Sequence, residues 1–266
     1  MLIKYIFLDL DGTLLDKNKK IGVNNLKTLT DISTRFDIVL CSGRSPLAMK
    51  PYIDSLSLNT GFSISFNGAI IFENNSLETL RSFTLSNKDL LMIFTFILLL
   101  NIPVSVDIST SNDVYQITDF APSKYQTISH NFLNFHKIKI IEIPQKIAIA
   151  TCIIMGSPSN IEKIKNNITP KLNNLFSITK SRSDMLEFLP SEANKLNAAK
   201  NLVSKKGDNL SNIIFFGNDE NDITLLKKAG IGVAMGNSSD IVKKNSDMVI
   251  GSNNNDSISN LLNLLI

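Results

Sequence analysis

Short apolar runs that end in polar residues alternate with helix-like segments along most of the chain. The apolar runs lie at about 4–12, 36–45, 61–72, 212–223, 230–237 and 246–251, and the helix-like segments at about 24–35, 46–58, 194–206, 220–229 and 238–245. Continuous runs rich in Ile, Val and Phe are typical of strands that are buried on both faces. Strand alternating with helix predicts an α/β core with a doubly wound, Rossmann-like parallel sheet.

Four of the apolar runs end in a side chain that can bind a ligand: Asp9, Ser42, Asn67 and Asn218. In doubly wound sheets, ligands bind beyond the carboxyl ends of the strands. We therefore expect these four residues to share one rim of the sheet.

The alternation stops between residues 82 and 187. We expect this stretch to be a smaller α+β domain inserted into a core formed by 1–81 and 188–266. The apolar run at 90–100 is eleven residues long, whereas a membrane span needs about 20. It predicts a helix at 87–100 that is buried on most sides.

Within the insert, "PVSVDIS" with "DVYQIT" predicts a strand pair, and "FSITKS" with "DMLEFLP" predicts a hairpin. "KIAIATCIIMG" predicts a further strand, and "SPSNIEKIKNNI" predicts a helix with a Ser-Pro start. The stretch 119–146 is polar and poorly periodic. His130 and His136 have no partner chemistry in view, and we expect both to be ordinary residues of the insert.

The composition excludes several classes of protein. A chain of 266 residues with 43% hydrophobic and 19% charged residues is globular, and its net charge of +3 is too small to predict nucleic-acid binding. Cys41 and Cys152 lie too far apart for a disulfide framework or a metal pair, and suit a reducing cytoplasm. Acidic residues interrupt the first apolar run before a signal peptide could be complete. We expect a cytoplasmic protein with a small-molecule partner and no membrane or nucleic-acid contact; the sequence says nothing of its oligomeric state.

The stretch "YIFLDLDGTLLD", residues 5–16, places two acids at the end of a buried strand. A buried, unpaired charge is costly, so Asp9 and Asp11 either meet a cation or do chemistry. A calcium loop needs Gly at its sixth position and Glu at its twelfth. Counted from Asp9, these positions hold Leu14 and Lys20, which argues against calcium.

Four motifs follow one another in the order of a known enzyme class. They are "FLDLDGTLL", "CSGRS", "NKLNAAKNL" and "FFGNDENDITLLKKAGIGVAMGNS". In this order, with an insert between the second and third, the chain resembles the haloacid dehalogenase superfamily of phosphatases. It looks like the Cof-type branch, which carries a large α/β cap domain at the place of the insert. The resemblance covers the chain nearly end to end.

The resemblance implies a Mg²⁺-dependent phosphatase that acts on small phosphorylated metabolites, with sugar phosphates as the expected class. Asp9 would be the nucleophile that forms an aspartyl-phosphate. Asp11 would protonate the leaving oxygen and later deprotonate the attacking water. Lys195 would be the catalytic cation that also binds phosphate; Lys200 is a rival that lies later in the helix.

The same resemblance assigns the ligand-binding residues. Phosphate would meet four residues besides Lys195: Leu10, Ser42, Gly43 and Asn221. Mg²⁺ would meet Asp9, Asp11 and Asn218, and Asp219 could compensate for the neutral Asn218 directly or through water. Asp222 would be an outer-sphere acid that orients metal-bound water. Asn218 stands where the family has Asp, so the site loses a negative charge and we expect weaker Mg²⁺ binding.

Two alternatives remain open at the level of sequence. The chain could be a non-catalytic phospho-ligand binder or regulator with a metal site weakened by Asn218. It could also be a phosphotransferase built on the same site. Both acids of the first motif favour hydrolysis over a binder, because a binder has no need of a nucleophile.

Overall fold

The computed structural model describes residues 2–128 and 133–265, which divide into two compact units. Unit 1 comprises Met1–Arg44, Met49–Leu80 and Asn194–Ile266, and unit 2 comprises Ser45–Ala48 and Arg81–Ala193. The later boundary follows Ala193, whereas the sequence placed it after residue 187. That residue lies inside strand β11, which pairs with other strands of unit 2.

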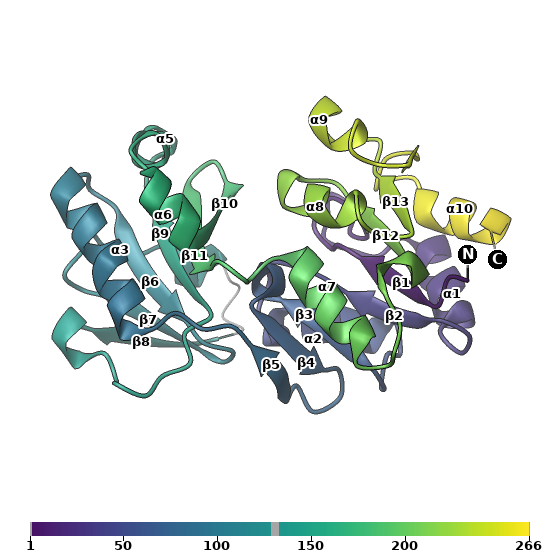
Figure 1. Cartoon of the computed structure of the whole chain (residues 1–266), viewed down its shortest axis with the longest axis horizontal. Coiled ribbons are helices and arrows are strands. Elements are labelled where there is room, and N and C mark those ends of the chain that lie inside the picture. The colour runs from purple at the N-terminus through teal and green to yellow at the C-terminus, as the bar shows by residue number, and fades with distance from the viewer. Residues whose placement is uncertain (1, 129–132, 266) are drawn as a thin grey trace. The chain divides into compact units, whose positions relative to one another are not determined.

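Unit 1 contains a parallel sheet of five strands in the order β14-β13-β12-β1-β2 (Figure 1). The strands are β1 (Tyr5–Leu8), β2 (Asp37–Leu40), β12 (Ile213–Gly217), β13 (Ile231–Ala234) and β14 (Met248–Val249). Its helices are α1 (Val23–Ile32), α2 (Pro46–Ser55), α7 (Lys195–Ser204), α8 (Ile223–Leu226), α9 (Asp240–Lys243) and α10 (Ser257–Leu265), with the short 3₁₀ helices η3 (Leu210–Asn212) and η4 (Glu220–Asp222). The predicted doubly wound α/β core is confirmed.

Both faces of β1, an interior strand of this sheet, are covered, as its sequence predicts. Phe7 packs with Phe215 of β12 and with Ala198 of α7 in one cluster. Ile6 and Leu8 alternate with Phe7 along the strand and are also fully buried. The continuous apolar run therefore has no solvent-facing side, which is the expected pattern of a buried parallel strand.

The sequence suggested a single strand at 61–72, but the structure does not form one. The run forms β3 (Phe62–Ser65), the 3₁₀ turn η1 (Phe66–Gly68) and β4 (Ile70–Glu73), which join β5 (Thr79–Ser82) in a separate three-stranded sheet. Asn67 in the turn has φ of +52°, a left-handed conformation that Asn tolerates better than most residues. This reversal lets the chain fold back as an antiparallel pair.

Unit 2 is built on a six-stranded sheet with the order β10-β11-β9-β6-β7-β8. The strands are β6 (Ser105–Ser109), β7 (Asp113–Ile117), β8 (Asn134–Ile138), β9 (Thr151–Met155), β10 (Phe176–Arg182) and β11 (Met185–Pro190). Its helices are α3 (Asn87–Leu100), α4 (Tyr125–Ile128), α5 (Pro158–Asn166), α6 (Pro170–Leu175) and the 3₁₀ helix η2 (Ile140–Glu142). The predicted strand pair, hairpin and Ser-Pro helix are all present.

Sequence reasoning missed one strand of unit 2. β8 lies in the poorly periodic stretch and pairs in parallel with β7 at the sheet edge. Its residues are mostly exposed or half-buried, so the apolar periodicity that marks a strand is absent. His136 on β8 contacts Asp113 at 2.8 Å and stacks on Tyr115, while His130 lies outside the described residues.

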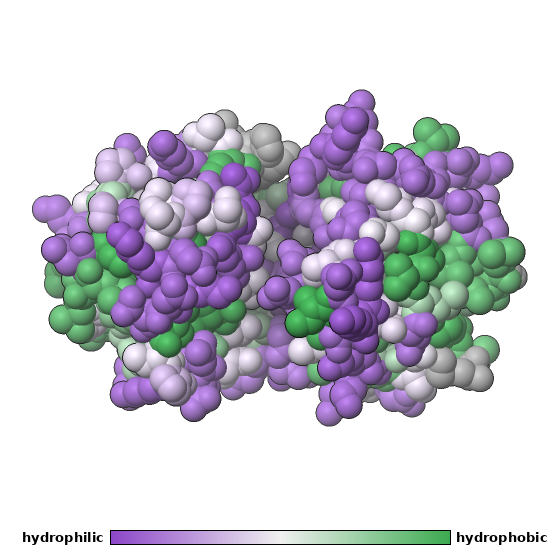
Figure 2. Space-filling model, turned by 90° about the horizontal axis from the view of Figure 1, so that it is seen from above, coloured by the Kyte–Doolittle hydropathy of each residue, from purple (hydrophilic) through white to green (hydrophobic). Residues whose placement is uncertain are grey.

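Helix α3 is buried on one face only, so the expectation of burial on most sides is wrong. Leu90, Ile93, Phe94 and Ile97 pack into the core of unit 2, whereas Leu99 is 81% exposed. The helix spans the predicted 87–100 and begins with a capping box in which Ser86 accepts from the Asp89 N–H. Among the described residues, no helix has both the length and the apolarity to cross a bilayer. The face in Figure 2 is mainly hydrophilic, with smaller hydrophobic areas between.

One face of the unit 2 sheet carries a polar row across neighbouring strands. Asp107 on β6, Gln116 on β7 and Lys137 on β8 lie directly opposite one another in the pairing register. Asp107 is fully buried, and one carboxylate oxygen accepts a 2.5 Å hydrogen bond from Ser123. Burial raises the pKa of Asp107 to about 7, although the Ser123 hydroxyl opposes this.

We expect Asp107 to make the stability of the protein depend on pH. The folded-state pKa lies above the usual value of about 4, so the folded protein holds a proton that the unfolded chain releases. Its contribution to stability is therefore lost as pH rises from about 4 to about 7, and is constant above. In Asp107→Asn, the gain in unfolding free energy over wild type should grow through this window by up to about 1.4 kcal/mol per pH unit.

Urea unfolding followed by circular dichroism at a series of pH values measures this difference. Asp31→Asn, which removes an exposed carboxylate, is the matched control and should show no such trend. A constant difference between Asp107→Asn and wild type over the window would contradict the assignment.

Candidate active site

The polar residues that follow the strands of unit 1 meet in two contacts. Asp9 follows β1 and lies 3.0 Å from the side chain of Asn218, which follows β12. The Asn67 N–H donates to the main-chain oxygen of Ser42, which follows β2, at 3.0 Å. β1 pairs with both β2 and β12, so both contacts lie at the carboxyl ends of neighbouring strands.

The centre of the site is an ammonium group between two carboxylates. Lys195 is the first residue of α7, and its Nζ donates to Asp9 Oδ1 and to Asp222 Oδ1, each at 2.7 Å. The lysine is 1% exposed, Asp9 7% and Asp222 0%. Such charges are stable in the interior only when they are paired, so each of the three depends on the others.

Burial and neighbouring charges together determine the pKa values of the groups in this cluster. Burial raises the pKa of Asp9 to about 7, and Asp222 adds to this, while Lys195 opposes it. Burial by itself would lower the pKa of Lys195, but the two carboxylates raise it, so the ammonium stays charged. Lys200, the rival lysine, is exposed, and α7 aims Lys195 rather than Lys200 at the two acids.

Asp222 also organises the loop that carries Asn218. Its second oxygen, Oδ2, accepts from the main-chain N–H groups of Asn218 and Asp219 at 2.9 and 3.0 Å. Asp219 is exposed and caps η4 by accepting from the Glu220 N–H. Asp222 is therefore engaged on both oxygens, and Asp219 is directed to the helix start.

The amide of Asn218 points at a group of oxygen atoms. One of its terminal atoms lies 2.8 Å from Thr13 Oγ1, 2.9 Å from the Asp11 main-chain oxygen and 3.0 Å from Asp9 Oδ2. Because two of these neighbours only accept, the amide presents its nitrogen to them when no cation is bound. Gly12 makes this approach possible: its φ is +84°, and a Cβ there would lie 2.5 Å from the amide.

These oxygens fit a divalent cation. A carboxylate oxygen of Asp9, the main-chain oxygen of Asp11 and the amide oxygen of Asn218 are the hard ligands that Mg²⁺ takes. The carboxylates alone do not suffice: in residues 2–128 and 133–265, no three His, Cys, Asp or Glu side chains are grouped to hold a metal ion. A cation here would rely on the main chain and on the amide, turned so that its oxygen faces inward.

The side chain of Asp11 faces two basic side chains, not the oxygen atoms around Asn218. Arg44 binds it through two hydrogen bonds, Nε to Oδ2 at 2.7 Å and Nη2 to Oδ1 at 2.8 Å, and Lys19 adds a third at 2.6 Å. The Arg44 guanidinium also packs over the Tyr52 ring. Although burial raises it, the pKa of Asp11 is lowered to about 2 by Arg44 and then Lys19. Asp11 is thus ionised, and its side chain is 40% exposed.

The residues expected to bind phosphate differ in the hydrogen-bonding groups that they present. Ser42 is 2% exposed, and its Oγ accepts from the Arg44 N–H at 3.2 Å, which leaves the hydroxyl proton to donate. Leu10 has a fully buried side chain, so only its main chain could face a ligand. Gly43 lies beside Asn67, whose amide a Cβ at Gly43 would approach to 3.1 Å. Asn221 Nδ2 donates to Asn67 Oδ1 at 3.0 Å.

Sequence reasoning missed four residues of this site that hold other site residues. These residues are Arg44, Lys19, Thr13 and Tyr52, to none of which the sequence assigns a role. Arg44 lies two residues after Ser42, the serine expected to bind phosphate, which is a usable signal for a rim residue. Lys19 and Tyr52 come from a loop and a helix with no motif. Only the folded chain shows that Lys19 contacts Asp11, and that Tyr52 contacts Arg44 and the Lys19 main chain.

The sequence profile of the haloacid dehalogenase-like hydrolases matches residues 6–262. The chain belongs to this family. The match covers both compact units, and so the expectation drawn from the four motifs is confirmed.

Three similar proteins match almost end to end. The 5-amino-6-(5-phospho-D-ribitylamino)uracil phosphatase YcsE of Bacillus subtilis is 28% identical over 97% of this chain and 93% of its own. The pyridoxal phosphate phosphatase YbhA of Escherichia coli is 24% identical over 98% of each chain. A haloacid dehalogenase-like hydrolase from Bacteroides thetaiotaomicron has a crystal structure that superposes with a TM-score of 0.85 at 25% identity, over 99% of this chain and 100% of its own. These findings agree with a phosphoric monoester hydrolase.

Removal of the central ammonium should destabilise unit 1. Lys195→Met leaves Asp9 and Asp222 buried without their cation, and we expect a loss of about 3 kcal/mol or more at neutral pH. Denaturant unfolding measures the loss. Lys200→Met removes an exposed charge from the same helix and should stay within about 0.5 kcal/mol of wild type. Equal stabilities of the two variants would contradict the structural role of Lys195.

Proposed function

We propose that the protein is a Mg²⁺-dependent phosphatase of small phosphorylated metabolites, sugar and polyol phosphates among them. The observation that carries the proposal is the buried Asp9 carboxylate at the end of β1, held by Lys195 at 2.7 Å. A buried acid in a fixed position, next to a cation that can also meet phosphate oxygens, suits a nucleophile.

In the proposed reaction, an oxygen of Asp9 attacks phosphorus and the bond to the ester oxygen breaks. The leaving oxygen takes a proton from Asp11, and the product is an aspartyl-phosphate on Asp9 together with a free alcohol. Water then attacks the phosphorus, Asp11 accepts the proton of that water, and Asp9 and inorganic phosphate are released.

Lys195, Ser42 and the main chain near Leu10 and Gly43 would bind phosphate oxygens, with Asn221 held by Asn67 at the same rim. Asp9, the Asp11 main chain and Asn218 would hold Mg²⁺, which offsets the repulsion between carboxylate and phosphate. Asp222 keeps Lys195 and the Asn218 loop in place.

Asp11 must change partners before it can act as an acid. Its pairing with Arg44 and Lys19 favours the ionised form, whereas proton donation requires the neutral form. The side chain is partly exposed, so a rotation towards the leaving group needs no unfolding of the core. We infer that substrate binding competes with Arg44 for this carboxylate.

The names of two relatives support a small phosphorylated substrate. YcsE is named for a ribityl phosphate ester and YbhA for pyridoxal phosphate. Both are small phosphomonoesters with different organic parts, so the family relation favours this class without choosing a member. The free, buried thiols of Cys41 and Cys152 support the proposed cytoplasmic location.

One observation favours a second candidate, a phospho-ligand binder without catalysis. The Asn218 amide already donates to Asp9 and Asp11 in the protein alone, so the acidic site does not require a cation to be satisfied. In this case phosphate would bind but the ester bond would stay intact.

Hydrolysis of an aryl phosphate across a Mg²⁺ titration tests the proposal. Wild type should turn over only with Mg²⁺, and Asp9→Asn should lose at least about 1,000-fold in kcat, because the amide is a far weaker nucleophile. Asp31→Asn, away from the site, should match wild type. Wild-type protein that binds phosphate esters but releases no phosphate, with aryl or metabolite substrates, would establish the binder instead.

Asn218→Asp tests the place of the cation without measuring activity. The new carboxylate lies beside Asp9, so without Mg²⁺ we expect a lower melting temperature than wild type. With Mg²⁺ we expect a larger rise in melting temperature and roughly tenfold tighter Mg²⁺ binding by calorimetry. Asn24→Asp adds the same charge at an exposed position and is the control. An unchanged Mg²⁺ affinity would exclude Asn218 from the cation site.

A further inference from the structure

Two basic side chains of unit 1 converge on one carboxylate. Arg44 Nε and Nη2 donate to the two oxygens of Asp11 at 2.7 and 2.8 Å, and Lys19 Nζ donates to Asp11 Oδ1 at 2.6 Å. Two parallel hydrogen bonds from one guanidinium are the geometry in which arginine recognises carboxylates. The Asp11 side chain therefore occupies a position with the donors of a carboxylate-binding site.

Contacts that do not involve Asp11 hold these two cations in place. The Arg44 guanidinium lies over the Tyr52 ring, 5.1 Å from its centroid, and Nη1 donates to Tyr52 Oη at 3.3 Å. Tyr52 Oη in turn donates to the main-chain oxygen of Lys19 at 3.2 Å. Lys19 has φ of +60°, a conformation that such a residue keeps only where its surroundings hold it. The pair of cations is therefore preorganised and would persist without the Asp11 carboxylate.

The proposed reaction takes the carboxylate away from both cations. The inference rests on the proposed function, in which Asp11 donates a proton to the leaving oxygen and so must turn from Arg44 and Lys19. Within residues 2–128 and 133–265, no other carboxylate lies at ion-pair distance from either cation. The two positive groups repel each other when their common counter-ion leaves, so this turn is unfavourable unless another anion replaces Asp11.

We propose that the replacing anion is a carboxylate of the substrate itself, so that the protein favours short phosphorylated hydroxy acids. The Asp11 carboxylate moves between Arg44 and the leaving oxygen by rotation about its side-chain bonds alone. A substrate carboxylate at Arg44 and Lys19 must therefore lie close to the ester oxygen, which limits the substrate to a short chain. A carboxylate suits the site better than a second phosphate, because the group now held there is a carboxylate bound through both oxygens.

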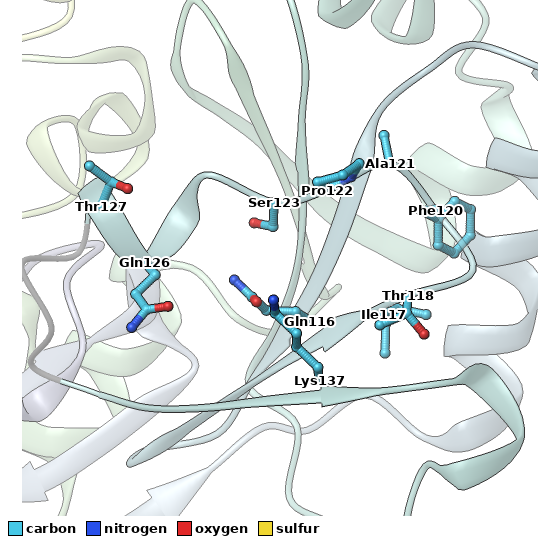
Figure 3. Close-up of a pocket in the computed structure, with 10 residues that line it drawn as sticks. All are labelled: Gln116, Ile117, Thr118, Phe120, Ala121, Pro122, Ser123, Gln126, Thr127 and Lys137. Carbon is cyan, nitrogen blue, oxygen red and sulfur yellow. The ribbon is translucent and has the colours of Figure 1, made fainter.

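The cavity of unit 2 is a rival location for a substrate carboxylate. Its volume is about 680 Å³, and among the ten lining residues labelled in Figure 3 only Lys137 is charged. One flexible ammonium group binds a carboxylate less selectively than a guanidinium with its fixed pair of donors. Arg44 and Lys19 also provide two positive charges where the cavity provides one. Substitutions at the two locations separate these possibilities.

Calorimetry with two esters of equal chain length tests the preference. 3-Phosphoglycerate carries a carboxylate where glycerol 3-phosphate carries a hydroxymethyl group. The full chain with Asp9→Asn, which lacks the proposed nucleophile, binds either ester without turnover. At one fixed Mg²⁺ concentration we expect its Kd for 3-phosphoglycerate to be roughly fivefold to tenfold lower than for glycerol 3-phosphate.

Substitutions in this Asp9→Asn background show which cations cause the difference. Arg44→Met should bring the ratio of the two Kd values close to one, and Lys19→Met should reduce it to about half, because the more exposed ammonium contributes less. Arg35→Met and Lys17→Met remove the same charges at other exposed positions and should leave the ratio unchanged. Lys19→Met alters an exposed side chain, so it tests the site even if Arg44→Met lowers the melting temperature.

Two results of the binding experiment would overturn the proposal. One is an equal affinity of Asp9→Asn for the two esters. The other is a preference that survives Arg44→Met and is lost in Lys137→Met. Neither result bears on hydrolysis, because both measure binding alone. Conversely, wild type that prefers 3-phosphoglycerate in binding but hydrolyses neither ester would contradict the proposed phosphatase function and not the anion site.

Hydrolysis by wild type tests whether the carboxylate must belong to the substrate. We expect kcat/KM to be at least about tenfold higher for 3-phosphoglycerate than for glycerol 3-phosphate, because the carboxylate both binds and releases Asp11. Free glycerate, added to the reaction with glycerol 3-phosphate, should not raise its rate. Activation by free glycerate, without a preference between the two esters, would overturn the assignment of the anion to the substrate.

Discussion

A single buried ammonium group, Lys195, holds the functional end of unit 1 together. It joins the acid that follows β1 to the acid of the loop after β12, and it does so from the first turn of α7. A charge in that position is unfavourable by itself, because it is desolvated and lies near the positive end of a helix. The two carboxylates reverse this balance, so none of the three groups can be exchanged alone.

The rest of the site follows from that pairing. Asp222 uses its second oxygen to fix the loop N–H groups, and the loop in turn presents Asn218 to Asp9 and to the Asp11 main chain. Gly12 leaves the space for that amide. The result is a compact group of oxygen ligands. A carboxylate in place of the neutral Asn218 would bind a cation more strongly.

The two acids of the first motif end in opposite environments although they are two residues apart. Asp9 points into the protein, where burial raises its pKa, while Asp11 points to Arg44 and Lys19, which lower its pKa. An extended chain directs alternate side chains to opposite faces, and this alone separates the two roles. The partner of each acid, however, comes from a distant part of the chain.

Unit 2 shows which strands and helices apolar patterning can predict and which it cannot. Its strands β6, β9 and β11 are buried and readable, but β8 is exposed at an edge and has no period-2 signal. The apolar run of α3 correctly predicted a helix, but the expected burial on most sides was wrong. Hydrophobicity does not determine how many sides of a helix are covered by other elements. The row of Asp107, Gln116 and Lys137 arises only when three strands align in register.

The sequence by itself determined the parallel core, the inserted second unit, the position of both acids after β1 and the lysine at the start of α7. These depend on local patterns and on motif spacing, which are properties of the chain. Only the tertiary structure decided that Arg44 and Lys19 hold Asp11 and that Asn67 holds Asn221. Those contacts join residues far apart in the chain, and their energies depend on distances and burial that no local pattern contains.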